Sequence, residues 1–240
     1  MSKTQFDTVF ISDVHLGTDR CNIDKFLKFL NELDTKKIVM VCDILDIHCM
    51  ERYNTYWRTK HTKAVEKILE LCEKGTKVVY VLGNHDAIAR KYVKNERINL
   101  HRNLMICDSY VHHSGKDKKF LCVHGDKYSE YSSGSWKQYF MNKGYETITP
   151  LNNFLKKTID FSLVNFLKGI SRGKEYIDNY EMDLIQYVRG FYGYEGVIVG
   201  HIHHANIREY HGTTYMCCGD WCDTCSAIVE ENGLFRIIKY

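Results

Sequence analysis

The chain has 240 residues, of which 44% are hydrophobic, and a formal net charge of +3. This size and composition predict one α/β domain with a large core, and so small a charge does not indicate a nucleic-acid partner. No stretch reaches the roughly 18 apolar residues of a membrane-spanning helix, and residues 1–7 do not resemble a signal peptide. We therefore expect a cytoplasmic protein whose ten cysteines are reduced thiols.

The first half of the sequence alternates strand-like and helix-like segments. Continuous apolar runs at Thr8–Ser12, Ile38–Cys42 and Val78–Leu82 are typical of strands covered on both faces. Between them, Asn22–Leu33 and Ala64–Cys72 carry apolar residues at helical spacing. This alternation predicts parallel strands with helices packed on the sheet.

The second half is richer in strands. Apolar or alternating runs predict strands at Asn103–Val111, Lys119–Val123, Gly196–Gly200, Ile207–Tyr210, Thr213–Cys217 and Ser226–Ile238. Within the last run, Asn232-Gly233 predicts a hairpin turn. We expect an α/β fold in which two β-sheets face each other with helices outside.

Residues 130–192 form a mostly helical insertion or lid within this single domain, according to the sequence pattern. Its segment Phe154–Ile170 is apolar on nearly every side of a helix and also carries lysines. Such a helix is either buried against its neighbour Tyr180–Phe191 or in contact with an apolar ligand such as an acyl chain.

Potential metal ligands gather in five short segments, most of which follow a predicted strand. They are Asp13-Val14-His15, Asp43-Ile44-Leu45-Asp46, Asn84-His85-Asp86, His124-Gly125-Asp126 and His201-Ile202-His203. Each segment alone could be a helix cap or a turn. Together they provide carboxylates, imidazoles and a carboxamide at strand ends, where ligands collect in parallel α/β sheets. The set predicts a site for two divalent cations.

In this order, the motifs Asp-x-His, Asp-x-x-Asp, Gly-Asn-His-Asp, His-Gly-Asp and Gly-His-x-His resemble the calcineurin-like metallophosphoesterase superfamily. The resemblance covers residues 11–203 and implies a four-layer αββα sandwich of two mixed sheets. It also implies the metal ligands, namely Asp13, His15 and His203 for one cation, Asn84, His124 and His201 for the second, and Asp43 bridging both. Mn²⁺ is the expected metal, with Fe, Zn and Mg as alternatives.

The same resemblance implies the chemistry. A hydroxide held by the metals attacks phosphorus in line, and His85 protonates the leaving oxygen or clamps the phosphoryl group. Asp46 and Asp86 are expected to orient the imidazoles. One position departs from the family pattern, because Cys42 stands where a glycine is usual.

The C-terminal part narrows the resemblance to UDP-2,3-diacylglucosamine pyrophosphohydrolases of lipid A biosynthesis. Residues 200–205, 215–221 and 225–230 carry this likeness, which implies release of UMP and a lipid-sugar phosphate at the inner membrane face. Against it, the better-known members carry arginine at the position of His85. A metallophosphoesterase acting on another nucleotide, cyclic nucleotide or phospholipid-type ester therefore remains the alternative. A non-catalytic, protein-binding scaffold is the remote one, because every ligand position is filled.

A cysteine cluster near the C-terminus raises a separate question. Cys217, Cys218, Cys222 and Cys225 contain one Cys-x-x-Cys pair but no second pair at zinc-site spacing. We expect buried or rim thiols there rather than a structural zinc.

Overall fold

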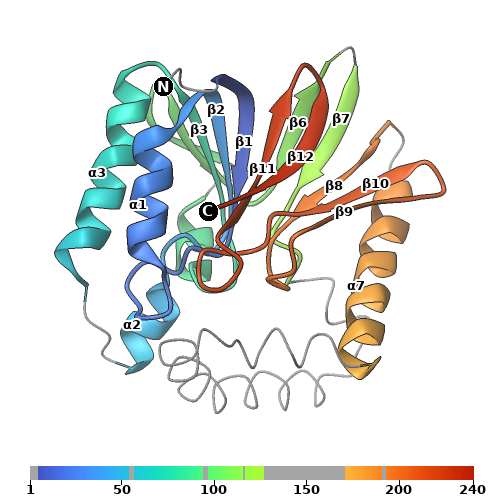
Figure 1. The fold of residues 1–240 in the computed structure, drawn as a ribbon, viewed down its shortest axis with the longest axis horizontal. Helices are drawn as coiled ribbons and strands as arrows, with labels where there is room; N and C mark the ends of the chain where they lie inside the picture. The colour runs from blue at the N-terminus through green and yellow to red at the C-terminus, as the bar shows by residue number, and fades with distance from the viewer. Residues whose placement is uncertain (1–4, 54–56, 94–96, 116, 127–170, 191–192) are drawn as a thin grey trace.

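The computed structural model describes residues 5–53, 57–93, 97–115, 117–126, 171–190 and 193–240. Two β-sheets are stacked face to face, and helices cover both outer surfaces (Figure 1). This is the α/β architecture of two mixed sheets with flanking helices that the sequence predicts. Within the described residues, no helix combines the length and the apolar character needed to span a membrane.

The first sheet has seven strands in the order β12-β11-β1-β2-β3-β5-β4. Their bounds are β1 Gln5–Ile11, β2 Asp34–Val41, β3 Lys77–Val81, β4 Arg97–His101, β5 Leu104–Cys107, β11 Ser226–Glu231 and β12 Leu234–Lys239. The central strands β1, β2, β3 and β5 are parallel, and the strands at both edges are antiparallel to their neighbours. The carboxyl ends of the central strands therefore meet at one end of the sheet.

The second sheet has five strands in the order β6-β7-β8-β10-β9. Their bounds are β6 Tyr110–Ser114, β7 Lys118–Cys122, β8 Gly196–Val199, β9 Asn206–Tyr210 and β10 Thr213–Cys217. Here β7, β8 and β10 are parallel, whereas β6 and β9 pair antiparallel at the edges.

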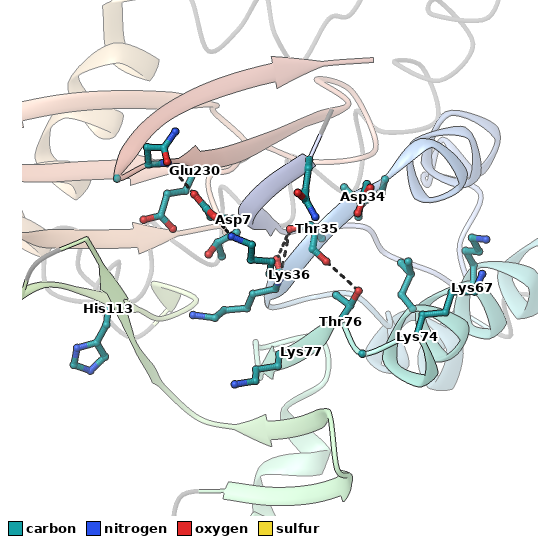
Figure 2. Close-up of a pocket in the computed structure, with 18 of the residues that line it drawn as sticks. Asp7, Asp34, Thr35, Lys36, Lys67, Lys74, Thr76, Lys77, His113 and Glu230 are labelled. Atoms are coloured by element: carbon teal, nitrogen blue, oxygen red, sulfur yellow. Dashed lines mark hydrogen bonds and ion pairs between the residues drawn. The ribbon is translucent and has the colours of Figure 1, made fainter. Parts of the chain in front are cut away.

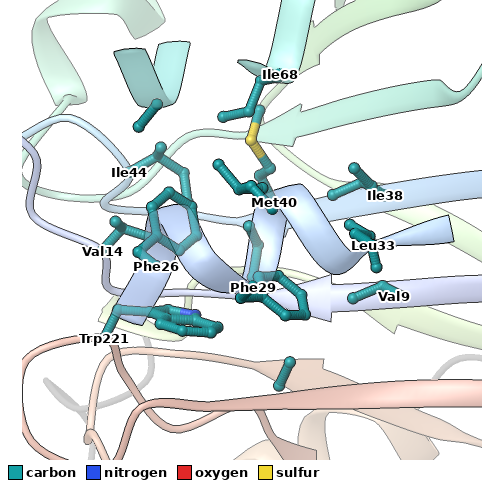
Figure 3. Packing of buried hydrophobic residues seen from close by; sticks show 14 of the residues in the cluster. Val9, Val14, Phe26, Phe29, Leu33, Ile38, Met40, Ile44, Ile68 and Trp221 are labelled. Carbon is teal, nitrogen blue, oxygen red and sulfur yellow. The ribbon is translucent and has the colours of Figure 1, made fainter. Parts of the chain in front are cut away.

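Helices α1 (Ile23–Glu32) and α3 (Thr59–Glu73) cover the outer face of the first sheet, and α7 (Ser171–Arg189) covers the second. Side chains alternate along the strands, so that Ile38 faces the helices while Val39 faces the other sheet. The outer core contains Trp221, which packs on Phe26 and Phe29 at ring distances of 5.0 and 4.8 Å (Figure 3). Each large apolar side chain buried in this way contributes about 1.5–3 kcal/mol.

Some element boundaries differ from the sequence-based expectation. The run 103–111 is not one strand but two, β5 in the first sheet and β6 in the second, because the chain crosses between sheets at Asp108 and Ser109. The sequence pattern does not reveal such a crossing, because apolar residues continue on both sides of Asp108 and Ser109, from β5 into Tyr110 and Val111 of β6. The sequence also gave no signal for β4, for α2 (Ile47–Tyr53) or for the 3₁₀ helix η1 (Ala87–Tyr92). The predicted helix Phe154–Ile170 lies outside the described residues.

Candidate metal centre

The segments that follow β1 and β2 are held side by side by their backbones. Asp13 N–H donates to the Cys42 carbonyl at 3.1 Å, and His15 N–H donates to the Asp43 carbonyl at 2.9 Å. One residue further on, Leu16 and Leu45 form an isolated parallel bridge. The parallel pairing of the strands thus continues into the loops and fixes the first two ligand segments against each other.

Unusual backbone conformations concentrate in these loops. Ten non-glycine residues of the described chain have positive φ, and six of them belong to this end of the sandwich: Asp13, His15, Cys42, Asp43, His201 and His203. Each such conformation costs about 1–3 kcal/mol and persists only when the surrounding contacts impose it. Such a concentration is typical of functional sites, which makes this end of the sandwich the candidate site.

Two glycines leave room for the carboxylates. A Cβ at Gly83 would lie 2.1 Å from Asp43 Oδ1, and a Cβ at Gly200 would lie 2.3 Å from Asp13 Oδ2. Any side chain at either position would displace a predicted ligand, so both glycines are required by close approach.

The first predicted ligand group is assembled, with Asp13 and His15 buried and His203 half-buried. His203 Nε2 lies 3.2 Å from Asp13 Oδ1, and His15 Nε2 lies 3.9 Å from the same oxygen. One atom of each of the three residues lies within 4.8 Å of the others. Asp13 Oδ1 and His15 Nε2 are buried without a hydrogen-bond partner. Buried polar atoms are rarely unpaired, and a cation between them would satisfy both.

The second predicted group converges on one nitrogen. His124 Nε2 lies 2.5 Å from Asn84 Oδ1, 3.2 Å from Asp43 Oδ2 and 3.2 Å from His201 Nδ1. An amide oxygen, a carboxylate oxygen and a second ring nitrogen thus lie around the same imidazole nitrogen. Nitrogen and oxygen donors in this mixture suit borderline and hard divalent metals.

Asp43 lies between the two groups. Its Oδ1 accepts from the backbone N–H of His85 at 3.0 Å, and its Oδ2 faces His124. Asp13, Asp43 and His124 also form a candidate metal-binding group of their own. The placement fits the expected bridging carboxylate, and the two groups together fit a pair of cations.

The charges of the protein alone show how strongly this point attracts positive charge. Burial lowers the pKa of His124, but the Asp43 carboxylate outweighs burial and raises it to about 9. Burial and the neighbouring His124 lower the pKa of His201 to about 4. Burial raises the pKa of the Asp43 carboxyl, but His124 and the other nearby imidazoles hold it well below its usual range.

Asp46 holds two imidazoles at once. Its Oδ2 bonds His15 Nδ1 at 2.8 Å, and its Oδ1 bonds His85 Nδ1 at 2.7 Å. Each ring is therefore oriented through Nδ1, which leaves Nε2 for chemistry. His85 is half-buried, and its ring stands edge-on to His15 at 4.8 Å.

The structure places Asp86 differently from the expectation that it orients an imidazole. Its carboxylate accepts hydrogen bonds from the Tyr80 hydroxyl and from Gly83 N–H. Burial and the nearby Asp43 raise its pKa to about 6. These contacts hold the loop that carries Asn84 against strand β3. Neither hydrogen bond goes to an imidazole, so they do not support the expected role of Asp86 in orienting one, and that role stays a prediction.

Sequence reasoning missed Asp220 as a supporting residue. Its Oδ2 lies 3.5 Å from His203 Nδ1, and its Oδ1 accepts the N–H groups of Cys222 and Thr224 at 2.7 and 3.1 Å. Asp220 follows β10 in the same way as Asp13 follows β1, and that signal could have found it.

Two further features lie apart from this centre. A cavity of about 790 Å³, lined in part by Lys36, Lys74 and Lys77, opens at the amino ends of β1 to β3 and contains none of the predicted ligands (Figure 2). No disulfide joins any of the ten cysteines, all of which lie in the described residues. The candidate metal groups found among those residues contain no cysteine.

The model of the family described as "Calcineurin-like phosphoesterase" matches residues 6–205. The chain therefore belongs to the calcineurin-like phosphoesterases, a family of phosphoester hydrolases that typically bind two divalent metals. No curated protein matches the chain.

Three solved structures illustrate the likeness of fold. YfcE, a phosphoesterase from E. coli, is 14% identical over 97% of this chain and 92% of that one, with a TM-score of 0.50. An archaeal phosphodiesterase is also 14% identical, over 97% and 99%, with a TM-score of 0.46. A Vps29 mutant from Entamoeba histolytica is 12% identical over 97% and 98%, with a TM-score of 0.48. At these identities the similarity concerns the fold alone.

Proposed function

We propose that this chain is a dinuclear metal-dependent hydrolase of a phosphodiester or pyrophosphate bond, with Mn²⁺ as the metal. One observation supports this most strongly: seven side chains from both sheets lie together, and two of their buried atoms, Asp13 Oδ1 and His15 Nε2, have no hydrogen-bond partner. The proposed ligands are Asp13, His15 and His203 for one cation, Asn84, His124 and His201 for the other, and Asp43 for both.

When bound, the cations neutralise charge on the phosphoryl oxygens and lower the pKa of the attacking water. The chain supplies the remaining elements. His85, held through Nδ1 by Asp46, presents Nε2 to the leaving oxygen and gives it a proton or a hydrogen bond. Burial lowers the pKa of His85, but Asp46 and Asp43 together outweigh burial and raise it.

For the substrate we propose UDP-2,3-diacylglucosamine or a close nucleotide–lipid analogue, cleaved at the membrane face. The support is the sequence likeness of the C-terminal segments and the apolar, lysine-bearing segment 154–170, which lies outside the described residues. Two residues of these C-terminal segments, Asp220 and Trp221, have structural roles that do not depend on the substrate. Asp220 contacts His203, and Trp221 packs beneath α1.

His85 favours a second candidate, a phosphoesterase that acts on a smaller nucleotide or phospholipid-type ester. Histidine here is the general pattern of the wider superfamily, and its contact with Asp46 is that of a proton donor rather than of an arginine clamp.

The test is hydrolysis of a panel in Mn²⁺ buffer, with products identified by mass. The panel contains UDP-2,3-diacylglucosamine, nucleotides, cyclic nucleotides and a chromogenic phosphodiester. Release of UMP and a lipid-sugar phosphate, well above turnover of the other compounds, would support the lipid-linked substrate. Turnover of the smaller esters alone would favour the second candidate, and no Mn²⁺-dependent turnover of any compound would refute the hydrolase.

Two variants refine the result. His85→Ala should lower turnover while two metals stay bound, and loss of one metal would reassign His85 as a ligand. Charged substitutions in residues 161–166 should impair a lipid-linked substrate far more than a soluble ester. Equal loss on both would remove the support for a lipid-binding segment.

A further inference from the structure

Arg90 connects three strand ends around the second ligand group. It lies in η1, directly after the Asn84 loop, and its side chain is 24% exposed. Its Nη2 donates to the Leu82 carbonyl at 3.1 Å, and its Nε lies 2.9 Å from Asp108 Oδ1. Its Nη1 and Nη2 lie 3.3 and 3.4 Å from the two carboxylate oxygens of Asp126.

These acceptors adjoin residues of the second ligand group. Leu82 is two residues before Asn84 at the end of β3, and Asp126 is two residues after His124 at the end of β7. The two strands belong to different sheets. Arg90 therefore spans the gap between the sheets where an amide oxygen from one must meet an imidazole from the other.

We propose that Arg90 is the positioning residue of the second metal site. It sets the separation of Asn84 and His124 through the backbone of the two loops without contacting a metal or a substrate. Asp13 of the first ligand group is linked to the second sheet by a separate contact, in which its Oδ2 accepts from His201 N–H at 3.0 Å. Loss of Arg90 should therefore weaken one site and spare the other.

The chemistry of the contact requires arginine. A planar guanidinium offers five donors in a fixed fork and can serve a carbonyl and two carboxylates together. A lysine at this position keeps the charge but donates hydrogen bonds to fewer partners. Its ammonium group also lacks the planar fork that fixes the partners in one plane. Arg90→Lys thus separates the geometric role from the charge, and it keeps most of the packing.

The inference rests on the proposed function, since it assumes two cation sites. The experiment is an equilibrium titration with Mn²⁺, in which free metal is read by electron paramagnetic resonance, for the wild type, Arg90→Lys and Arg90→Ala. We expect one of two sites to weaken by about 10- to 100-fold, the range typical for residues that support metal ligands. Unfolding temperatures of the metal-free proteins are measured beside the titrations.

Arg208→Ala is the matched control. Arg208 also bonds two carboxylates, Asp178 at 2.9 Å and Glu181 at 3.1 Å, but it ties β9 to α7 away from the ligands. We expect this variant to lose stability and to keep both metal affinities.

The variant Asn84→Ala shows which of the two metal sites depends on Arg90. Asn84→Ala should already lack the second site, so adding Arg90→Lys should cause no further loss at the remaining one. Two wild-type sites that both keep their affinity in Arg90→Lys, or that weaken equally, would overturn this inference alone. A wild-type chain that binds no Mn²⁺ would overturn the proposed function and this inference with it.

Discussion

Among the described residues, carboxylate–imidazole contacts occur at two places, and they differ in kind. Between the sheets, on β6 and β11, His112 Nε2 bonds Glu230 Oε2 at 2.8 Å, and the His112 ring stands edge-on to Phe10. At the carboxyl ends of the strands, several such contacts share partners, and many of the residues that make them have positive φ, which neither His112 nor Glu230 has.

The difference indicates what each place is for. A single buried pair on regular strands holds two sheets together, and its loss should lower stability. A cluster of carboxylates and imidazoles on loops with positive φ carries an energetic cost that the rest of the fold must offset, and loss of such a cluster should lower function. Mutations at the two places should therefore have opposite profiles.

Asp43→Ala should give the largest effect. Because Asp43 faces both ligand groups, we expect turnover of a phosphodiester to fall by more than about 1000-fold and bound Mn²⁺ to fall below two per chain. Stability of the metal-free protein should change little, since the lost contact with His124 is offset by relief of the repulsion that Asp43 exerts on Asp13 and Asp86. Steady-state kinetics, metal analysis and urea unfolding measure the three quantities. Wild-type turnover in this variant would contradict the shared-ligand assignment.

Glu230→Ala should show the reverse profile. The Glu230 side chain is 5% exposed, so removing it leaves a buried imidazole without its partner, at a cost of about 3 kcal/mol. Urea unfolding measures this loss, and Mn²⁺ affinity should stay at the wild-type value. Weakened metal binding at unchanged stability would show that the two places are not separate.

We also expect the Glu230 carboxylate to make the stability of the protein depend on pH. Burial raises the pKa of Glu230, but the interactions of its carboxylate with His112 and with neighbouring hydroxyl groups together outweigh burial and hold the pKa below its ordinary value of 4.5. A lowered folded-state pKa contributes stability that is fully present above pH 4.5 and is lost as pH falls through that value and below it. The stability difference between wild type and Glu230→Ala should thus shrink below pH 4.5. A difference that stays constant from pH 7 to pH 3 would exclude this linkage.

Asp220→Asn should produce a smaller and more selective effect. It weakens the support behind His203, and we expect the first metal site to lose about 10- to 100-fold in affinity while the second keeps its own. A Mn²⁺ titration measures both sites. Asp223→Asn, three residues away, serves as a control and should leave both sites unchanged. Equal weakening of both sites by Asp220→Asn would show that Asp220 does not act through His203.

The sequence predicts which side chains lie together at this end of the sandwich, because most of them follow a strand that an apolar run reveals, as at Asp13 and Asp43. Supporting residues are harder to predict, because their partners are distant in sequence. Arg90 is in a short 3₁₀ helix that no periodicity marks, and its carboxylate partners follow other strands. Asp86 has the sequence context of an orienting carboxylate, yet its hydrogen bonds go to Tyr80 and Gly83. Only the folded chain decides which nearby group a carboxylate meets.

The smallest expected effect lies at Cys42, where the family usually has glycine. Cys42 has a φ of +77°, a conformation that disfavours any side chain by about 1 kcal/mol or more. Its thiol is buried in the core between the sheets, so replacement also loses packing.

Comparing Cys42→Gly with Cys42→Ala separates the loss of packing from the backbone strain, because both variants lose the thiol and only glycine relieves the backbone. In a strand or helix interior, alanine is the more stable of the two by roughly 0.5–1 kcal/mol. Here we expect the glycine variant to be the more stable by about 1 kcal/mol in urea unfolding. The ordinary order, with alanine ahead, would show that the loop before Asp43 stores no strain at this residue.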